Sequence, residues 1–280
     1  MQPVRISICL LSVIIIGNHM SIQLQPQCAE LEQWVMLARE ECASFEVLDP
    51  FFLSGLGNFE KNKQLAQQYR EIGMAASVHG AFIDVNPASG DPAFRELSRQ
   101  RCRESCEIAL ALGAENVVFH SSAFPFLRGA YLENWAVSCA SFYEELVNQY
   151  PVRIYIENAQ DLDPTPLRSL MERIHSDRVG VCLDIGHAHY SHTPVSQWFD
   201  QLGQWIQYLH LSDNLGGFDD HLPLGKGSID WEQVNELWES LGKDIPITLE
   251  TGNLESTRES IGFLRRNHYF GLKGTGNEKF

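Results

Sequence analysis

The sequence lacks an excess of basic side chains. Its 280 residues contain 21 lysines and arginines against 36 aspartates and glutamates, which gives a formal net charge of −15. A field of this sign repels polyanions, so it disfavours nucleic acid and anionic membranes as partners, although it leaves room for a local basic patch. We therefore expect a small polar ligand as the partner, with no membrane association.

Paired cysteines are also lacking. The seven cysteines are scattered, odd in number and contain no C-x-x-C pair. This usage is typical of reduced thiols rather than of a disulfide framework, and it favours a cytoplasmic protein. The oligomeric state stays open, and a homo-oligomer is compatible with the sequence.

The chain has one long apolar run near its start, residues 6–16, and eleven residues are too few to span a bilayer. The run also resembles the core of a signal peptide, but no A-x-A cleavage pattern follows it. Its isoleucine and valine content, and the helical pattern over residues 29–44, favour a buried first β-strand. We therefore predict that residues 6–16 form a strand.

No G-x-G-x-x-G motif opens a helix, and no polar low-complexity tract divides the chain before its last ten residues. Instead, short apolar runs alternate with longer helical patterns. Eight such units in this length predict an α/β fold, a single (β/α)8 TIM barrel of parallel strands with outer helices, over an open doubly wound sheet. The barrel is expected over residues 1–270, with a disordered tail over 271–280. The predicted strands lie within residues 6–16, 44–49, 75–80, 115–122, 152–159, 179–187, 206–213 and 246–253.

Potential metal ligands stand at six of the eight predicted strand ends. Aspartates, glutamates and histidines make up about one position in six, so chance predicts one or two such endings. Active sites of TIM barrels lie at the carboxyl ends of the strands, where these residues converge. They are His79, His120, Glu157, Asp184, His210 and Glu250. His187 follows Asp184 by three residues, and the loop after the seventh strand adds Asp219 and His221.

Four carboxylates and five histidines at one mouth need a positive counter-charge, because buried like charges repel and lose hydration. A divalent metal supplies it, and a mixed nitrogen and oxygen ligand set suits Mn, Co, Fe or Zn better than Ca. Each residue also has a simpler interpretation. His79 alone is more typical of a hydrogen-bonded core residue, and Asp184 alone of a helix cap. These simpler interpretations need a separate reason for each strand end, whereas one metal site explains all of them together. The metal site is therefore favoured.

These motifs resemble a known family. "HLSDNLGGFDDHLPLGKGSIDW", with "IEN" and "LDIGHAH" before it and "ETG" after it, is similar to the xylose-isomerase-like TIM-barrel superfamily, from about Phe45 to Arg266. The resemblance implies a divalent ion, with Mn, Co, Mg or Zn as candidates. In the isomerase and epimerase branch, one ion is held by four residues that match Glu157, Asp184, His210 and Glu250. In the endonuclease IV branch, three zinc ions use nine ligands, which match all nine candidates.

The two branches imply different chemistry. The isomerase branch implies proton transfer through a metal-stabilised enediolate of a sugar or sugar phosphate, with Glu157 and Glu250 as catalytic acid and base. The endonuclease branch implies phosphodiester hydrolysis, with His79, His120, His187, Asp219 and His221 as further metal ligands. "HGAF", "HSSAF" and "DIGH" depart from the endonuclease pattern. We therefore expect an isomerase or epimerase, in which those five residues bind substrate or a further metal.

Overall fold

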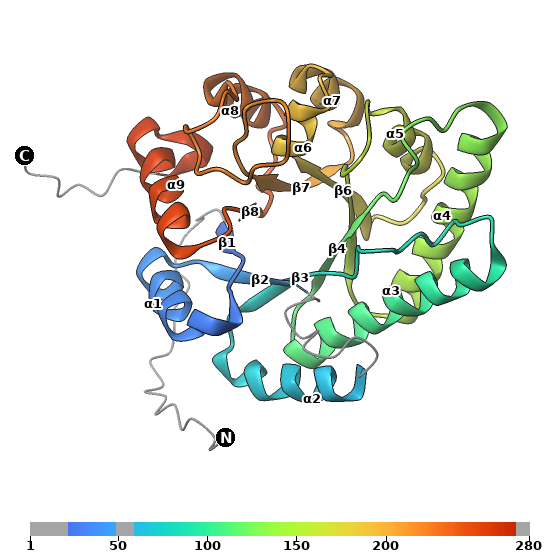
Figure 1. Cartoon of the computed structure of the whole chain (residues 1–280), viewed down its shortest axis with the longest axis horizontal. Coiled ribbons are helices and arrows are strands. Elements are labelled where there is room, and N and C mark those ends of the chain that lie inside the picture. Colours follow the sequence, from blue (N-terminus) through green and yellow to red (C-terminus); the bar gives the residue numbers. More distant parts are fainter. Residues whose placement is uncertain (1–21, 49–58, 273–280) are drawn as a thin grey trace, which may run out of the picture.

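Eight parallel strands close into a barrel in the computed structural model, which describes residues 22–48 and 59–272 (Figure 1). Each strand pairs with the next along the chain, and the eighth pairs with the first, so no sheet edge is left open. The predicted TIM barrel is confirmed. The strands are β1 (Ile22–Leu24), β2 (Ser44–Leu48), β3 (Ala75–His79), β4 (Asn116–His120), β5 (Arg153–Glu157), β6 (Val179–Asp184), β7 (Ile206–Leu211) and β8 (Ile247–Leu249).

Helices surround this ring and connect consecutive strands (Figure 1). Local signals explain their limits. In α3, Asp91 caps the first turn by accepting hydrogen bonds from the amides of Ala93 and Phe94, and Gly113 ends the helix at a φ of 82°. The helices are α1 (Leu31–Glu41), α2 (Phe59–Tyr69), α3 (Pro92–Leu112), α4 (Gly129–Gln149), α5 (Thr165–Met171), α6 (Ile185–Tyr190), α7 (Val195–Leu202), α8 (Trp231–Ser240) and α9 (Leu254–Asn267).

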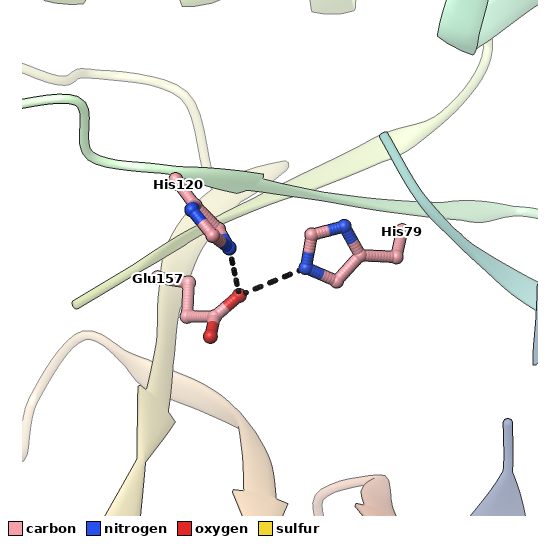
Figure 2. A group of neighbouring side chains, drawn as sticks. All are labelled: His79, His120 and Glu157. Carbon is pink, nitrogen blue, oxygen red and sulfur yellow. Dashed lines mark ion pairs between the residues drawn. The ribbon is translucent and has the colours of Figure 1, made fainter. Parts of the chain in front are cut away.

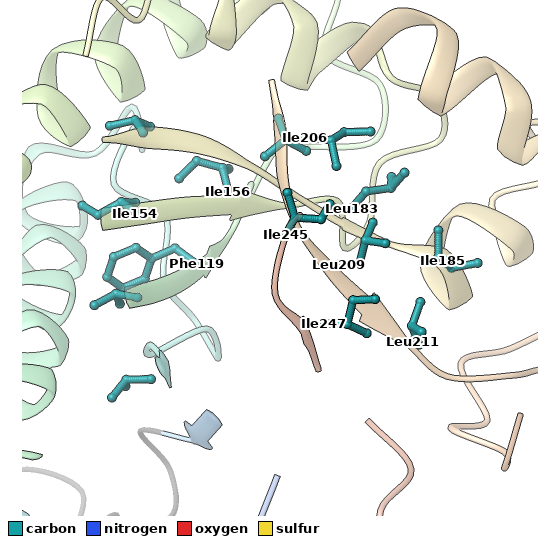
Figure 3. Close-up of a cluster of buried hydrophobic side chains, with 14 of the residues drawn as sticks. Phe119, Ile154, Ile156, Leu183, Ile185, Ile206, Leu209, Leu211, Ile245 and Ile247 are labelled. Atoms are coloured by element: carbon teal, nitrogen blue, oxygen red, sulfur yellow. The ribbon is translucent and has the colours of Figure 1, made fainter. Parts of the chain in front are cut away.

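Side chains alternate along each strand between the helices and the barrel interior. Apolar residues such as Ile154, Ile156 and Ile247 belong to the large core between strands and helices (Figure 3). The intervening residues face inward, where Tyr155 and Tyr208 belong to a small separate cluster. Polar side chains fill most of the remaining interior positions. This period of two places ligand-type residues inside the mouth while the outer faces stay apolar.

The first strand of the barrel is not supplied by residues 6–16, as was predicted, but by a later segment. Residues 6–16 lie outside the described residues, and β1 at Ile22–Leu24 fills the position between β2 and β8. The prediction assumed a strand that is apolar on both faces. The true strand alternates, because Ile22 and Leu24 pack in the outer core while Gln23 is a buried polar residue. A three-residue alternating strand carries too weak a pattern to be found in advance.

Near the other end of the chain, Phe270 is fully buried and Leu272 packs against the core, so the packed part extends slightly past residue 270. The remainder of the predicted tail, residues 273–280, lies outside the described residues. The five cysteines whose side chains the structure describes form no disulfide with one another. Within the described ranges, no helix is both long enough and apolar enough to cross a membrane.

Candidate metal centre

The carboxyl ends of the strands carry the predicted ligands. The pairing register sets His120 beside Glu157 and Asp184 beside His210, so neighbouring strands present them at matching heights. Inward-facing residues at one end of a closed barrel converge on its axis. The six residues predicted at strand ends lie within one residue of those ends: His79, His120, Glu157, Asp184, His210 and Glu250.

Four of these residues form the four-ligand group. One potential ligand atom of each lies within 4.8 Å of the others, and all four residues are buried: Glu157, Asp184, His210 and Glu250. His210 Nδ1 lies 3.2 Å from Glu250 Oε1 and 3.5 Å from Glu157 Oε1. One nitrogen and three carboxylates at this spacing can hold a divalent ion.

A second group, His79, His120 and Glu157, shares the glutamate with the first (Figure 2). The Nε2 atoms of the two histidines lie 3.3 and 3.6 Å from the same oxygen, Glu157 Oε2. The two groups therefore divide the carboxylate between them. Glu157 Oε1 faces His210, and Glu157 Oε2 faces the histidine pair.

The remaining three predicted residues form a third cluster. Asp219 Oδ2 lies 3.2 Å from His187 Nε2 and 2.9 Å from His221 Nε2. The cluster adjoins the four-ligand group, because His187 Nδ1 lies 3.2 Å from Glu157 Oε1. The structure thus brings all nine predicted residues to the same mouth of the barrel.

Three of the histidines are oriented by backbone carbonyls. The Nδ1 atoms of His79, His187 and His221 lie 2.8–3.0 Å from the carbonyl oxygens of Gly80, Asn158 and Glu250. An Nδ1–H donor in each ring leaves a lone pair on Nε2, and this lone pair faces a carboxylate. Two acceptors face each other favourably only with a cation between them, either a proton or a metal ion.

The four-ligand group also holds buried atoms without hydrogen bonds. Among the described residues, no donor or acceptor satisfies either oxygen of Glu157, Oδ2 of Asp184 or Nδ1 of His210. Asp184 both caps α6 and joins the group, because its Oδ1 accepts from the amide of His187 while Oδ2 stays free. Unsatisfied buried carboxylates are costly, and a divalent ion held by the four-ligand group would satisfy Oε1 of Glu157, Oδ2 of Asp184 and Nδ1 of His210 together. The residues present therefore fit a metal.

Burial and mutual attraction shift the pKa values at this site. Burial opposes ionisation of Glu157, but His210 and His120 outweigh it and hold its pKa well below the usual range. Burial raises the pKa of Asp184 to about 7 and lowers that of His120 to about 3. Burial also opposes the charge on His79, yet the adjacent carboxylate of Glu157, 3.3 Å from its Nε2, raises its pKa to about 9. Protons thus take the place of metal ions when none is bound.

We predict that the metal-free protein loses stability as the pH rises from about 6.5 to about 9. The folded pKa of His79 lies above its unfolded value of 6.5, so its contribution is complete below pH 6.5 and is lost through pH 9. Asp184 acts in the same direction through pH 7. Zinc in the four-ligand group is expected to weaken this loss, because the ion neutralises Glu157, the carboxylate that raises the pKa of His79. Thermal unfolding midpoints with zinc and with a chelator measure both.

His79→Gln is expected to reduce this pH dependence, while His175→Gln on the exposed surface leaves it unchanged. A metal-free midpoint that stays constant or rises across this window contradicts the prediction.

Asp213 organises the loop that carries Asp219 and His221. Its buried carboxylate accepts hydrogen bonds from the amides of Asn214, Gly225 and Ile229 and from the indole of Trp231. A Cβ atom at position 227 would lie 2.2 Å from Asp213 Oδ1, so only glycine fits there. Asp213 thus has a structural role, whereas Asp219 and His221 of the same loop contact residues of the mouth.

Two polar residues near the site, the buried Glu46 and the half-buried Gln25, were not predicted. Glu46 on β2 contacts His210, and Gln25, just after β1, contacts both Glu46 and Glu250. The candidate ligands were expected at strand ends and in the loop after the seventh strand, whereas Glu46 lies in the middle of its strand. A single glutamate inside the apolar stretch "SFEVL" was the available signal.

Together, the closed barrel and its clustered acidic and histidine ligands define a TIM-barrel protein with a candidate metal centre at the carboxyl ends of its strands. Residues 37–267 match the family model described as xylose isomerase-like TIM barrel. The chain belongs to this family.

Curated relatives of the chain include uncharacterised proteins and probable endonuclease 4 proteins. It is 30% identical over 199 residues to the uncharacterised protein MJ1311 of Methanocaldococcus jannaschii, which covers 67% of this chain and 68% of the relative. It is 26% identical over 272 residues to a probable endonuclease 4 of Mycobacterium marinum, with 90% of this chain and 98% of the relative covered. The family is thus clear, while the relatives include an endonuclease.

Solved structures also resemble it. A D-tagatose 3-epimerase-like protein is 25% identical with a TM-score of 0.73, covering 88% of this chain and 96% of that one. A Thermus thermophilus protein, TTHB071, from a crystal soaked with ZnCl2 is 26% identical with the same TM-score, covering 88% of this chain and 97% of that one.

Proposed function

We propose that this chain is a divalent-metal-dependent isomerase or epimerase of a sugar or sugar phosphate, in which Glu157 and Glu250 transfer the proton. The supporting observation is the placement of two glutamates in one four-ligand group, on strands three apart around the ring. Two carboxylates approaching one bound substrate from different strands allow removal of a proton by one and its return by the other. The likeness to an epimerase-like structure supports the same reaction class.

The charge of the mouth favours a small substrate over nucleic acid. The loops that follow the described strands contain two basic side chains, Arg128 and Lys226. Arg128 lies 3.3 Å from Asp163, and Lys226 lies 4.0 Å from Glu259, so each has an acidic neighbour. Phosphodiester backbones are held mainly by basic side chains, and this mouth offers few. The same observation favours a neutral sugar over its phosphate.

Each residue has a defined task in this reaction. A bound divalent ion would polarise a sugar carbonyl and its neighbouring hydroxyl. One glutamate then accepts the proton from the adjacent carbon, and the other donates a proton to a carbon of the substrate. Asp184 and His210 complete the ligand set. His187, His221 and Asp219 border the group on the solvent side and orient substrate hydroxyls.

The test is incorporation of solvent deuterium into a panel of ketoses, their epimers and their phosphates, by protein loaded with Zn, Mn or Co. We expect exchange into at least one free sugar. Cleavage of abasic DNA is assayed beside it, with bound metal counted. Three zinc ions per chain, cleavage of abasic DNA and no exchange into any sugar would overturn the proposal.

Phosphodiester hydrolysis is the second candidate, because the group of His79, His120 and Glu157 offers a further metal position. The likeness to a probable endonuclease 4 points the same way. In a hydrolase that uses clustered metals, this group is essential. In the isomerase, its two histidines lie outside the four-ligand group.

Substitution of these histidines separates the two candidates. Removal of a catalytic carboxylate typically slows proton exchange about 10²–10⁴-fold. We predict that His79→Ala and His120→Ala each slow it by a factor that is at least about tenfold smaller. His175→Ala is the exposed control. If either substitution abolishes activity as completely as Glu157→Gln and removes a bound zinc ion, the hydrolase is the better interpretation.

A further inference from the structure

Glu46 is a buried carboxylate that has no task in the reaction proposed above. It lies in the middle of β2, is 0% exposed and faces the barrel interior. The register pairs Glu46 with Ser77, two residues before His79, so it lies one layer deeper than the ligands. An ionised group at this depth requires several hydrogen-bond donors.

Four donors surround it. Tyr208 Oη, Thr248 Oγ1 and His210 Nε2 lie 2.7, 3.0 and 3.1 Å from Glu46 Oε2. The amide of Gln25 donates to Glu46 Oε1 at 3.0 Å. Because every neighbour can donate, Glu46 is satisfied as a carboxylate and acts only as an acceptor.

His210 differs from His79, His187 and His221 in its anchor. Those three rings contact backbone carbonyls through Nδ1, whereas His210 contacts the side chain of Glu46 through Nε2. Its opposite nitrogen, Nδ1, is the atom within the four-ligand group. The tautomer that can bind a metal through Nδ1 must carry its proton on Nε2, where Glu46 accepts it.

Gln25 links the same carboxylate to a second ligand. Its Nε2 atom donates to Glu46 Oε1 and also to Glu250 Oε1. Two ligands of the group, His210 on β7 and Glu250 after β8, are therefore connected through residues of β2 and the segment after β1.

We propose that Glu46 is a positioning residue for the metal, holding the proton of His210 on Nε2 and directing Nδ1 into the four-ligand group, while Gln25 couples the same carboxylate to Glu250. This inference rests on the proposed function only in requiring that the four-ligand group binds a divalent ion. Carboxylates that orient ligating histidines commonly contribute a factor of about 10–100 in metal affinity.

The experiment measures the zinc dissociation constant by competition with a chromophoric chelator. Glu46→Gln is expected to weaken zinc binding about 10–100-fold, because the amide NH2 group can donate to an unprotonated Nε2 and so favour the tautomer with its proton on Nδ1. Thr248→Val is the matched control, since it also removes a hydrogen bond to Glu46 but leaves His210 in contact with it. The proposal is overturned if the two variants lose the same zinc affinity and these losses follow the decrease in unfolding midpoint.

A measurement on the unaltered protein covers the case in which Glu46→Gln fails to fold. Long-range ¹H–¹⁵N spectra of the zinc-loaded protein report which nitrogen of His210 carries the proton. A proton on Nε2 with zinc at Nδ1 supports the proposal, and the reverse assignment overturns it. Neither measurement uses catalysis, so failure to find an exchanging sugar affects only the proposed function.

Discussion

Replacing Glu157 with glutamine is expected to abolish proton exchange, with a loss of about 10²–10⁴-fold or more in kcat, and to remove bound metal. Glu157 is 0% exposed, and its two oxygens face two different ligand groups. An amide is a poor metal ligand and cannot accept the substrate proton. One substitution therefore removes a ligand from both groups together with a catalytic carboxylate.

The fold is expected to survive this change. In the metal-free protein, the glutamine NH2 group can donate to the histidine nitrogens that face position 157, which removes the need for a cation there. Metal content by mass spectrometry, proton exchange and thermal unfolding are measured on the same sample. Glu236→Gln on the exposed side of α8 is the matched control. Full zinc content with unchanged exchange in Glu157→Gln contradicts both assigned roles.

Glu250→Gln is expected to block turnover to a similar extent, about 10²–10⁴-fold, but to leave part of the reaction intact. If each glutamate serves one face of the substrate, the variant still exchanges the proton that Glu157 removes. It therefore labels one epimer with deuterium without converting it to the other. Gln25 already donates to Glu250 Oε1, and it can donate to the new amide oxygen in the same way.

The measurement compares deuterium incorporation into each epimer with net conversion between them. Glu255→Gln, in the first turn of α9, is the control for a surface glutamate near the same strand. Loss of exchange from both epimers at undiminished metal content would show that a single base serves both faces. Retention of full conversion would exclude Glu250 from proton transfer.

The sequence predicted the strand ends well because parallel strands end at one side of a barrel, so order along the chain determines position in space. His79 and His120 are far apart in sequence, yet both contact the same carboxylate oxygen of Glu157. Helix α6 was not predicted as a separate element. It begins at Ile185, directly after the last residue of β6, and is only six residues long, too short for a periodic pattern.

Contacts within the barrel could not be predicted in the same way. Gln25 and Glu46 carry no local signal of their partners, since these lie on strands at the opposite end of the chain. The division of Glu157 between two ligand groups depends on side-chain directions, which become defined only when all eight strands are in place. The local sequence pattern therefore identifies the candidate ligands, whereas the residues that orient them can be recognised only in the closed barrel.

The closure of the barrel also has a kinetic consequence. Glu46 and His210 are separated by 164 residues, and Gln25 and Glu250 by 225. Contacts over such sequence distances form slowly, because the intervening chain must first be ordered. During synthesis, β1 and β2 are made long before β7 and β8. The carboxylate of Glu46 therefore stays hydrated until its partners on the later strands are available. Metal binding at the four-ligand group therefore requires that β8 has already paired with β1, so it can serve as a measure of barrel closure.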